Sequence, residues 1–155
     1  MKRLLIIFLC CLILSGCRHP APVSTQPSTQ SPTAVSTEPI LTVIRVYHPE
    51  GYEEFQVETV DGDVLVDLLI REEVLTENVA LNSVIQEGDL LKLDFNSAFR
   101  DLIGAQGTSG ESTIIHCTVN TFLVNYGAES AMLTVNGEIL ESGHAIYDIP
   151  IPVMD

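Results

Sequence analysis

The chain has 155 residues, a formal net charge of −14 and no tryptophan. Its length allows one domain of ordinary size plus short accessory segments. A strongly acidic surface repels nucleic acids and anionic membranes, so nucleic-acid binding is excluded from the expected functions. Composition divides the chain into residues 1–16, 17–39 and 40–155, and the periodic apolar patterns lie in the last of these.

Residues 1–16 have the features of a bacterial lipoprotein signal peptide. Two basic residues precede an apolar run at 4–14, whose 11 residues are too short for a membrane-spanning helix. The sequence Leu14-Ser15-Gly16-Cys17 resembles the lipobox, in which the cysteine is lipidated before cleavage. An uncleaved signal anchor is the alternative. We expect Cys17 to carry diacylglycerol and to hold the protein at the extracytoplasmic face of the cell membrane, because two acyl chains give lasting attachment.

Residues 17–39 are expected to form a disordered tether. They contain five prolines and eight serines or threonines, without apolar periodicity. Cleavage would remove Lys2 and Arg3 and no acid, which takes the net charge from −14 to −16. Cys117 would then be the one cysteine of the 40–155 domain, so its fold is expected to depend on a hydrophobic core rather than on disulfides.

Two stretches near the start of this domain predict β-strands. Ile40–His48 is rich in β-branched residues, and Phe55–Val60 alternates apolar and polar side chains. Further along, Val79–Gln86 and Leu90–Phe95 flank Glu87-Gly88-Asp89, which predicts a β-hairpin.

Two shorter helical signals lie between these strands and after them. The sequence Asp61-Gly62-Asp63 predicts a turn in which Asp63 caps a helix that runs to about Glu73. A calcium loop is the alternative for these aspartates, but the apolar run that follows lacks the further oxygen ligands that such a loop needs. A short turn of helix is expected over Asn96–Ile103.

Glu111–Tyr126 is the strongest helix signal in the chain. Thr108 and Glu111 have the spacing of a capping box, and Gly127 lies where a C-cap glycine is expected. One face of this helix is apolar and is expected to be buried; it consists of Ile115, Val119, Phe122 and Tyr126.

A last strand is predicted at Ser130–Val135, closed by the turn Asn136-Gly137. The predicted order of elements is therefore β-β-α-β-β-α-β. Two helices packed on one face of a mainly antiparallel sheet is the simplest arrangement that buries both apolar stripes. The expected fold class is α/β of the α+β type.

Cys117 and His116 are the residues that could suggest a nucleophile and its base. Neighbours on a helix point about 100° apart, so they do not face each other as a catalytic pair must. A structural thiol is expected, and no catalytic residue is assigned. Asn120 and Thr121 lie off the apolar stripe and have two open roles, hydrogen bonding to a sheet edge or exposure toward a partner.

The remaining polar candidates are given structural roles. Asp94 is expected to cap or orient the turn that follows its strand. His144 with Tyr147 and Asp148 is expected to pin the tail onto the domain. His48 is too far from these residues in the sequence to predict a metal site, and no phosphate-binding loop is present, so no metal or cofactor is expected.

Several stretches resemble the GerM domain of sporulation and spore-germination lipoproteins. They are Leu93-Asp94-Phe95 with Phe99, Gly110-Glu111, Val119-Asn120-Thr121-Phe122-Leu123 with Tyr126, Thr134-Val135-Asn136-Gly137-Glu138, and Leu140-Glu141-Ser142-Gly143-His144 with Tyr147-Asp148. The resemblance covers about residues 43–150 and is strongest after Leu90, and the Gly-Pro and Pro-Gly-Thr motifs common early in the family are absent. The family-motif positions are Asp94, Phe99, Glu111, Asn120, Thr121, Gly137, His144, Tyr147 and Asp148.

This resemblance implies a fold similar to the ring-building motif, an αβ module that mediates assembly of extracytoplasmic complexes. Family members are not known as enzymes. It therefore implies a non-catalytic lipoprotein of a Gram-positive, spore-forming bacterium that binds a protein partner in sporulation or germination, without a small-molecule substrate. The alternatives are an envelope glycan-binding module, which needs an aromatic groove, and an envelope hydrolase, which needs acids or a histidine converging in a pocket.

Overall fold

The computed structural model describes residues 40–154. The predicted signal peptide, the lipidation site at Cys17 and the tether lie outside the described residues. The elements are β1 (Thr42–His48), β2 (Gly51–Val57), α1 (Gly62–Arg71), β3 (Leu81–Glu87), β4 (Leu90–Phe95), α2 (Ser97–Gly104), α3 (Thr108–Tyr126), β5 (Ser130–Val135), β6 (Glu138–Ile139) and β7 (Ile151–Pro152). None of the helices in this part of the chain is long and apolar enough to cross a membrane.

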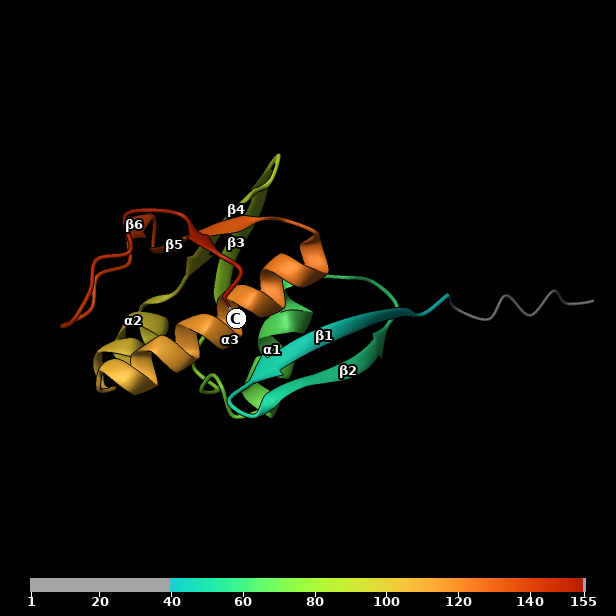
Figure 1. Ribbon diagram of the computed structural model, residues 1–155, viewed down its shortest axis with the longest axis horizontal. Coiled ribbons are helices and arrows are strands. Elements are labelled where there is room, and N and C mark those ends of the chain that lie inside the picture. The colour runs from blue at the N-terminus through green and yellow to red at the C-terminus, as the bar shows by residue number, and fades with distance from the viewer. Residues whose placement is uncertain (1–39, 155) are drawn as a thin grey trace, which may run out of the picture. The chain divides into compact units, whose positions relative to one another are not determined.

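Three helices pack with a mainly antiparallel sheet, which confirms the predicted α+β class (Figure 1). The five-stranded sheet has the order β3-β4-β5-β6, and β7 also pairs with β5. Only the β4–β5 pair among these strands is parallel, because α2 and α3 return the chain to the same end of the sheet. Helix α2 is the short helical turn expected over Asn96–Ile103, and the short strands β6 and β7 add to the predicted order of elements.

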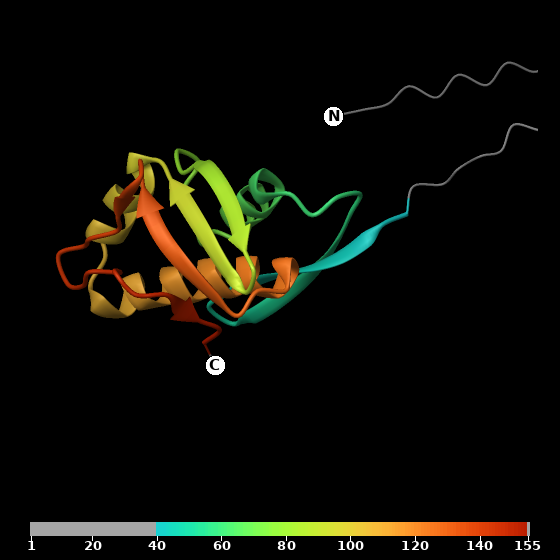
Figure 2. The same ribbon diagram turned by 90° about the horizontal axis from the view of Figure 1, so that it is seen from above.

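The first two strands form a separate antiparallel hairpin (Figure 2). The predicted strand Phe55–Val60 is displaced, since β2 begins at Gly51 and ends at Val57. Pro49 and Glu50 make a turn directly after β1, and the first four residues of β2 are all exposed. A strand that is exposed on both faces shows no apolar alternation, so the sequence could not reveal where it starts.

Helix α3 lies between the five-stranded sheet and the β1–β2 hairpin (Figures 1 and 2). Ile115, Val119 and Phe122 are buried, as their spacing predicted, and Tyr126 is half-buried. Every side chain from Cys117 to Leu123 is buried, however, including polar ones. A helix buried on all sides is a core helix, so α3 packs on the sheet as predicted and is also covered by the β1–β2 hairpin on its other side.

Three phenylalanines join this helix to the sheet and to α2. Phe95 of β4 stacks on Phe99 of α2 with ring centroids 4.3 Å apart, and it meets Phe122 of α3 edge-on at 6.2 Å. All three side chains are fully buried. The family-motif residue Phe99 is therefore part of the hydrophobic core.

The start of α1 differs from the prediction by two residues. Asp61, and not Asp63, is the N-cap, because the Asp61 carboxylate accepts a hydrogen bond from the Asp63 amide at 2.9 Å. Gly62 follows at the point of closest approach to β3. A Cβ atom there would lie 2.5 Å from Leu81 Cδ2 and 2.8 Å from Val84 Cγ2. The Asp-Gly-Asp sequence thus combines a cap with a tight packing contact.

The predicted C-terminal end of α3 is confirmed, whereas the predicted capping box at its N-terminal end is not. The helix begins at Thr108 after Gly107, and no side chain caps it, so the predicted capping box is wrong. The Glu111 side chain is buried and binds elsewhere, which removes it from the helix end. Gly127 ends the helix in the left-handed conformation at φ 66°, as predicted for a C-cap glycine.

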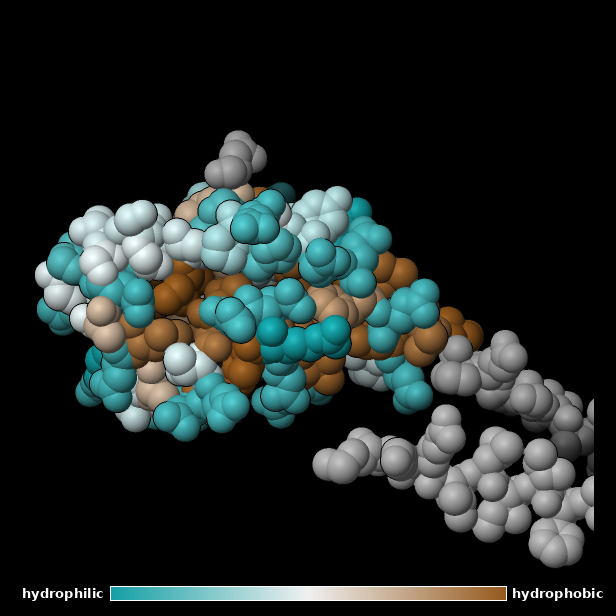
Figure 3. All heavy atoms as spheres, turned by 90° about the horizontal axis from the view of Figure 1, so that it is seen from below, coloured by the Kyte–Doolittle hydropathy of each residue, from teal (hydrophilic) through white to brown (hydrophobic). Residues whose placement is uncertain are grey.

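The surface of the domain is mostly polar. Figure 3 shows one face, on which apolar side chains reach the surface between polar ones. The large apolar side chains that are exposed are Ile40, Leu41, Val43, Tyr52, Ile85, Val124, Ile139, Ile146, Ile149 and Val153. Three of them lie in or just before β1, where the described chain begins.

The central position of α3 predicts that Phe122→Ala destabilises the domain by about 3–5 kcal/mol, because a fully buried ring leaves a cavity. That is a large part of the stability of an ordinary domain. Val124→Ala on the same helix is the control, since its side chain is 36% exposed. Denaturant melts measure both variants. Equal stabilities for the two variants would mean that the assigned inner face of α3 is wrong.

Candidate functional site

Asp94 of β4 accepts hydrogen bonds from two other segments of the sheet. Its Oδ1 accepts from Thr134 Oγ1 and from the Gly137 amide, both at 2.7 Å, and its Oδ2 accepts from Asn82 Nδ2 at 2.9 Å. Desolvation raises the pKa of the Asp94 carboxyl, but these three hydrogen bonds outweigh it and hold the pKa below its usual value. Asp94 therefore fixes the turn after β5, and not the turn after its own strand as the sequence suggested.

Glu111 in the first turn of α3 is only 2% exposed. Its Oε1 accepts from Ser142 Oγ and from the Tyr147 hydroxyl, both at 2.6 Å. Its Oε2 has no hydrogen-bond partner among residues 40–154. Desolvation and the adjacent Glu111 carboxylate raise the pKa of the Tyr147 phenol. Tyr147 is thus fastened to α3, which gives it the tail-pinning position expected from the sequence.

Asn120 of α3 holds the end of the described chain. Its Nδ2 donates to the Met154 carbonyl at 2.6 Å, and its Oδ1 accepts from the Met154 amide at 2.9 Å. The side chain is 1% exposed. Of the two roles left open by the sequence, Asn120 therefore has the hydrogen-bonded one, although its partner is the tail and not a sheet edge.

Two further side chains of α3 hold the outer edge of β1. Thr121 Oγ1 accepts from the Tyr47 amide at 2.9 Å. Asn125 Nδ2 donates to the Arg45 carbonyl at 2.6 Å, and Asn125 Oδ1 accepts from the Arg45 amide at 2.9 Å. Thr121 therefore has the sheet-edge role that the sequence offered as one alternative. These contacts cover the β1 edge with polar side chains of the helix.

The outer edge of β2 is left open by the same arrangement. In an antiparallel pair, residues alternate between facing the partner strand and facing away from it with their main-chain groups. Arg45 and Tyr47 face away from β2, so their opposite residues Glu54 and Tyr52 face away from β1, as does Gln56. Outside the hairpin, no hydrogen bond within the described residues reaches the main-chain groups of these three β2 residues.

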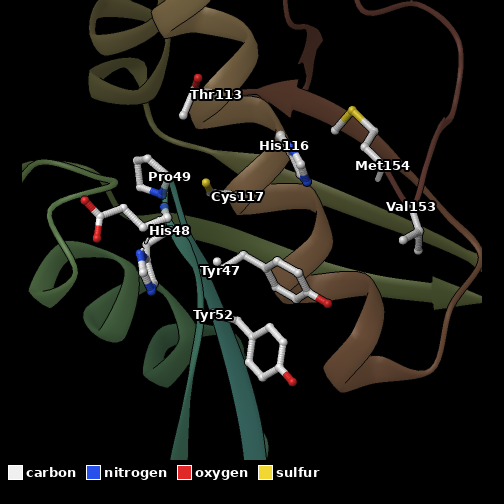
Figure 4. Close-up of a pocket in the computed structure, with 11 residues that line it drawn as sticks. Tyr47, His48, Pro49, Tyr52, Thr113, His116, Cys117, Val153 and Met154 are labelled. Atoms are coloured by element: carbon white, nitrogen blue, oxygen red, sulfur yellow. Dashed lines mark hydrogen bonds between the residues drawn. The ribbon is translucent and has the colours of Figure 1, made fainter.

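A groove of about 550 Å³ lies where the hairpin turn, α3 and the C-terminal tail meet (Figure 4). The hairpin contributes Tyr47 and Tyr52, whose ring centroids are 5.6 Å apart at an interplanar angle of 46°. The guanidinium carbon of Arg45 lies 5.1 Å from the Tyr52 ring centroid. The remaining lining residues are His48, Pro49, Glu50, Gly51, Thr113, His116, Cys117, Val153 and Met154.

Cys117 and His116 both line this groove, but they do not form a pair. Figure 4 shows the Cys117 sulfur and the His116 imidazole pointing to different sides of α3. The thiol side chain is 3% exposed, and desolvation raises its pKa. A thiol that is buried and held protonated is a poor nucleophile, so this part of the groove suits packing better than chemistry.

His48, His144 and Asp148 are not brought together, although His48 lines the same groove as His116. His48 lines the groove, where its Nδ1 accepts from the Glu50 amide at 3.3 Å. His144 lies beside Glu111 and Tyr147 at a separate small pocket of about 200 Å³. Asp148 is exposed in the tail. In the described part of the chain, no group of three or more His, Cys, Asp or Glu side chains is arranged to hold a metal ion.

Glu111 gives a test of how the tail is held. Glu111→Ala should destabilise the domain by about 1–3 kcal/mol for each hydroxyl left unpaired at Ser142 and Tyr147. Glu111→Gln keeps an acceptor oxygen and removes a buried charge, so it should change the free energy of unfolding by less than about 1 kcal/mol. Denaturant melts compare the two variants. Equal losses in both would contradict this expectation, because they would show that the tail needs the negative charge of Glu111 and not only its acceptor oxygen.

Comparison with known proteins finds similarity to solved structures. No family model matches the sequence, and no curated protein matches it. The first GerMN domain of the sporulation protein GerM from Bacillus subtilis is similar with a TM-score of 0.50 and 14% identity, over 74% of this chain and 95% of that one.

Two further structures are similar at lower TM-scores. A candidate lipoprotein from Clostridium perfringens has a TM-score of 0.47 and 14% identity, over 73% of this chain and 85% of that one. The tandem GerMN domains of GerM from Bacillus subtilis have a TM-score of 0.45 and 16% identity, over 83% of this chain and 49% of that one. At 14% sequence identity, the likeness to the first GerMN domain concerns the fold alone. The described domain has the GerMN fold, as the sequence resemblance implied.

Proposed function

We propose that this protein is a lipoprotein of the extracytoplasmic membrane face whose GerM-like domain binds a protein partner and carries out no chemistry. The partner would belong to an envelope complex of a sporulating Gram-positive bacterium. The lipobox at Cys17 supports the anchor. The GerMN fold supports the link to sporulation, since the similar domain comes from a sporulation protein.

The open outer edge of β2 is the observation that carries the binding proposal. Unpaired main-chain groups on an edge strand are a template for a strand of another protein, which is β-augmentation. Strand β3 is also at the edge of its sheet, but its register shifts between Leu81 and Ser83, and such irregularities discourage pairing. The β2 edge carries exposed Glu53 and Glu54, and the Glu54 carboxylate is paired with Arg45 at 3.1 Å. A partner strand with a basic side chain opposite Glu53 therefore fits this edge.

The positions of the acids and of the thiol support a role without chemistry. The Asp94 carboxylate is engaged by three hydrogen bonds within the sheet, and the Glu111 carboxylate holds the tail. The Cys117 thiol is buried beside an imidazole that points elsewhere. An envelope hydrolase would need such groups to converge on one cavity, as general acid–base catalysis requires, but Asp94 and Glu111 do not line the groove that holds Cys117.

The membrane anchor is tested by Cys17→Ser. Lipidation precedes cleavage in the lipoprotein route, so the variant should keep its signal peptide and lose its acyl chains. Radiolabelled palmitate incorporation and the apparent mass of the protein measure both effects, with Cys117→Ser as the matched control. A Cys17→Ser protein that matures to the normal length and stays lipid-labelled would disprove the anchor.

The binding edge is tested by Gln56→Pro. Proline removes the outward amide of residue 56 without touching the bonds between β1 and β2, and edge strands tolerate proline there. A photoreactive residue that replaces Glu54 should crosslink to a partner in membranes of sporulating cells. Gln56→Pro should reduce the amount of this crosslinked product about tenfold or more. Gln56→Thr keeps the amide and is the control.

Two results would contradict this proposal. Unchanged crosslinking and unchanged sporulation in a folded Gln56→Pro protein would show that the β2 edge is not the contact. Loss of function in a folded, membrane-bound Cys117→Ser protein that still crosslinks to its partner would favour an enzyme instead.

A further inference from the structure

The groove in Figure 4 brings two tyrosines together at the hairpin turn, in a chain that has no tryptophan. Two of the four tyrosines of the chain line this one cavity. Their rings point the same way from the hairpin, and Tyr52 is 49% exposed. The volume of about 550 Å³ lies within the usual range of small-ligand sites.

Some polar groups of this groove are bound within the protein, since the His48 imidazole accepts from the Glu50 amide and the Thr113 hydroxyl donates to the Ser109 carbonyl, but others are not. Most buried or half-buried polar side chains near α3, such as Thr121 and Asn125, bind main-chain groups of a neighbouring segment. By contrast, the hydroxyls of Tyr47 and Tyr52 and the imidazole of His116 make no hydrogen bond to any described residue. Aromatic faces beside unengaged donors and acceptors are the composition of a ligand site.

We propose that the Tyr47–Tyr52 groove binds a short neutral saccharide. A pyranose ring has a face of C–H groups, which packs on a phenol ring, and a rim of hydroxyls, which would bind His116 and the phenol oxygens. The Arg45 guanidinium lies over one face of the Tyr52 ring, and the Tyr47 ring centroid is 5.6 Å away, which is too close for a sugar to enter between the two rings. The sugar would therefore lie across the tyrosine pair on the side that lines the groove.

The charge and main-chain pairing of the groove favour a saccharide over other polymers. Glu50 lines the groove and the chain is strongly acidic, which disfavours an anionic polymer. A peptide in extended form would need free main-chain groups, but those of Arg45 and Tyr47 on this side of the hairpin are already bound to Asn125 and Thr121. Recognition at this groove would therefore rest on side chains.

Saturation-transfer-difference NMR on the full chain in detergent micelles tests this proposal, because it detects direct contact between protein protons and ligand protons. The probes are the N-acetylglucosamine tetramer, maltotetraose and a basic tetrapeptide without aromatic residues. Selective irradiation of aromatic protons should transfer magnetisation to sugar C–H protons of at least one saccharide, with a saturable response. Tyr52→Ala and His116→Ala should each weaken binding by about tenfold.

Matched variants separate a groove effect from a change of fold. Ile85→Ala removes a side chain that is 50% exposed on β3, outside the groove, and should bind as the unmodified protein does. Tyr52→Phe keeps the ring and should retain most of the stacking signal. Melting temperatures check folding of each variant, and His116→Ala serves if Tyr52→Ala fails to fold.

Three outcomes would overturn the proposal. The first is no saturable transfer to either saccharide. The second is saccharide binding that Tyr52→Ala and His116→Ala leave unchanged in folded proteins. The third is binding of the tetrapeptide alone, which would make the groove a peptide site. Because purified protein is used, each result is independent of whether the β2 edge binds a partner.

Discussion

The burial of α3 on all sides is the constraint on which the rest of the domain depends. An unpaired buried polar group costs about 1–3 kcal/mol, so the buried polar side chains of such a helix favour partners inside the protein. Thr118 Oγ1 and Glu111 Oε2 are the buried side-chain oxygen atoms of α3 that have none among residues 40–154. By contrast, Asn120, Thr121 and Asn125 bind the main chain of the tail and of β1. The hairpin and the tail are therefore placed by hydrogen bonds from the helix as well as by apolar packing.

This placement decides which surfaces stay available. The helix covers the β1 edge with the Thr121 and Asn125 side chains, and so the unpaired edge of the hairpin is that of β2. The same docking brings the hairpin turn next to α3 and the tail, which creates the groove with Tyr47 and Tyr52. An open strand edge on the hairpin and an aromatic groove at its turn would let the domain contact a protein and a saccharide at once, if both proposals hold. Such double contact raises the effective concentration of each partner.

The sequence predicted the elements with strong local signals and missed the contacts between distant segments. Strands β4 and β5, the C-cap at Gly127 and the turn at Asn136-Gly137 follow from alternation and turn chemistry, which are properties of neighbouring residues. Glu111 resembled a capping residue because its spacing from Thr108 fits, yet burial under the tail gives it another partner. The hydrogen bonds of Asn125 and Ser142 were not predicted, because their partners are 80 and 31 residues away in the sequence. Residue spacing indicates only contacts between near neighbours.

Amide hydrogen exchange tests most directly the claim that α3 fixes the hairpin and leaves β2 open. Unpaired edge amides exchange quickly, whereas bonded buried amides exchange only on larger openings of the fold. The docking of β1 on α3 predicts slow exchange for the Arg45 and Tyr47 amides, close to that of the core residues of α3, and fast exchange for the Glu54 and Gln56 amides. Fast exchange at Arg45 and Tyr47, or strong protection at Glu54 and Gln56 in the isolated protein, would contradict it.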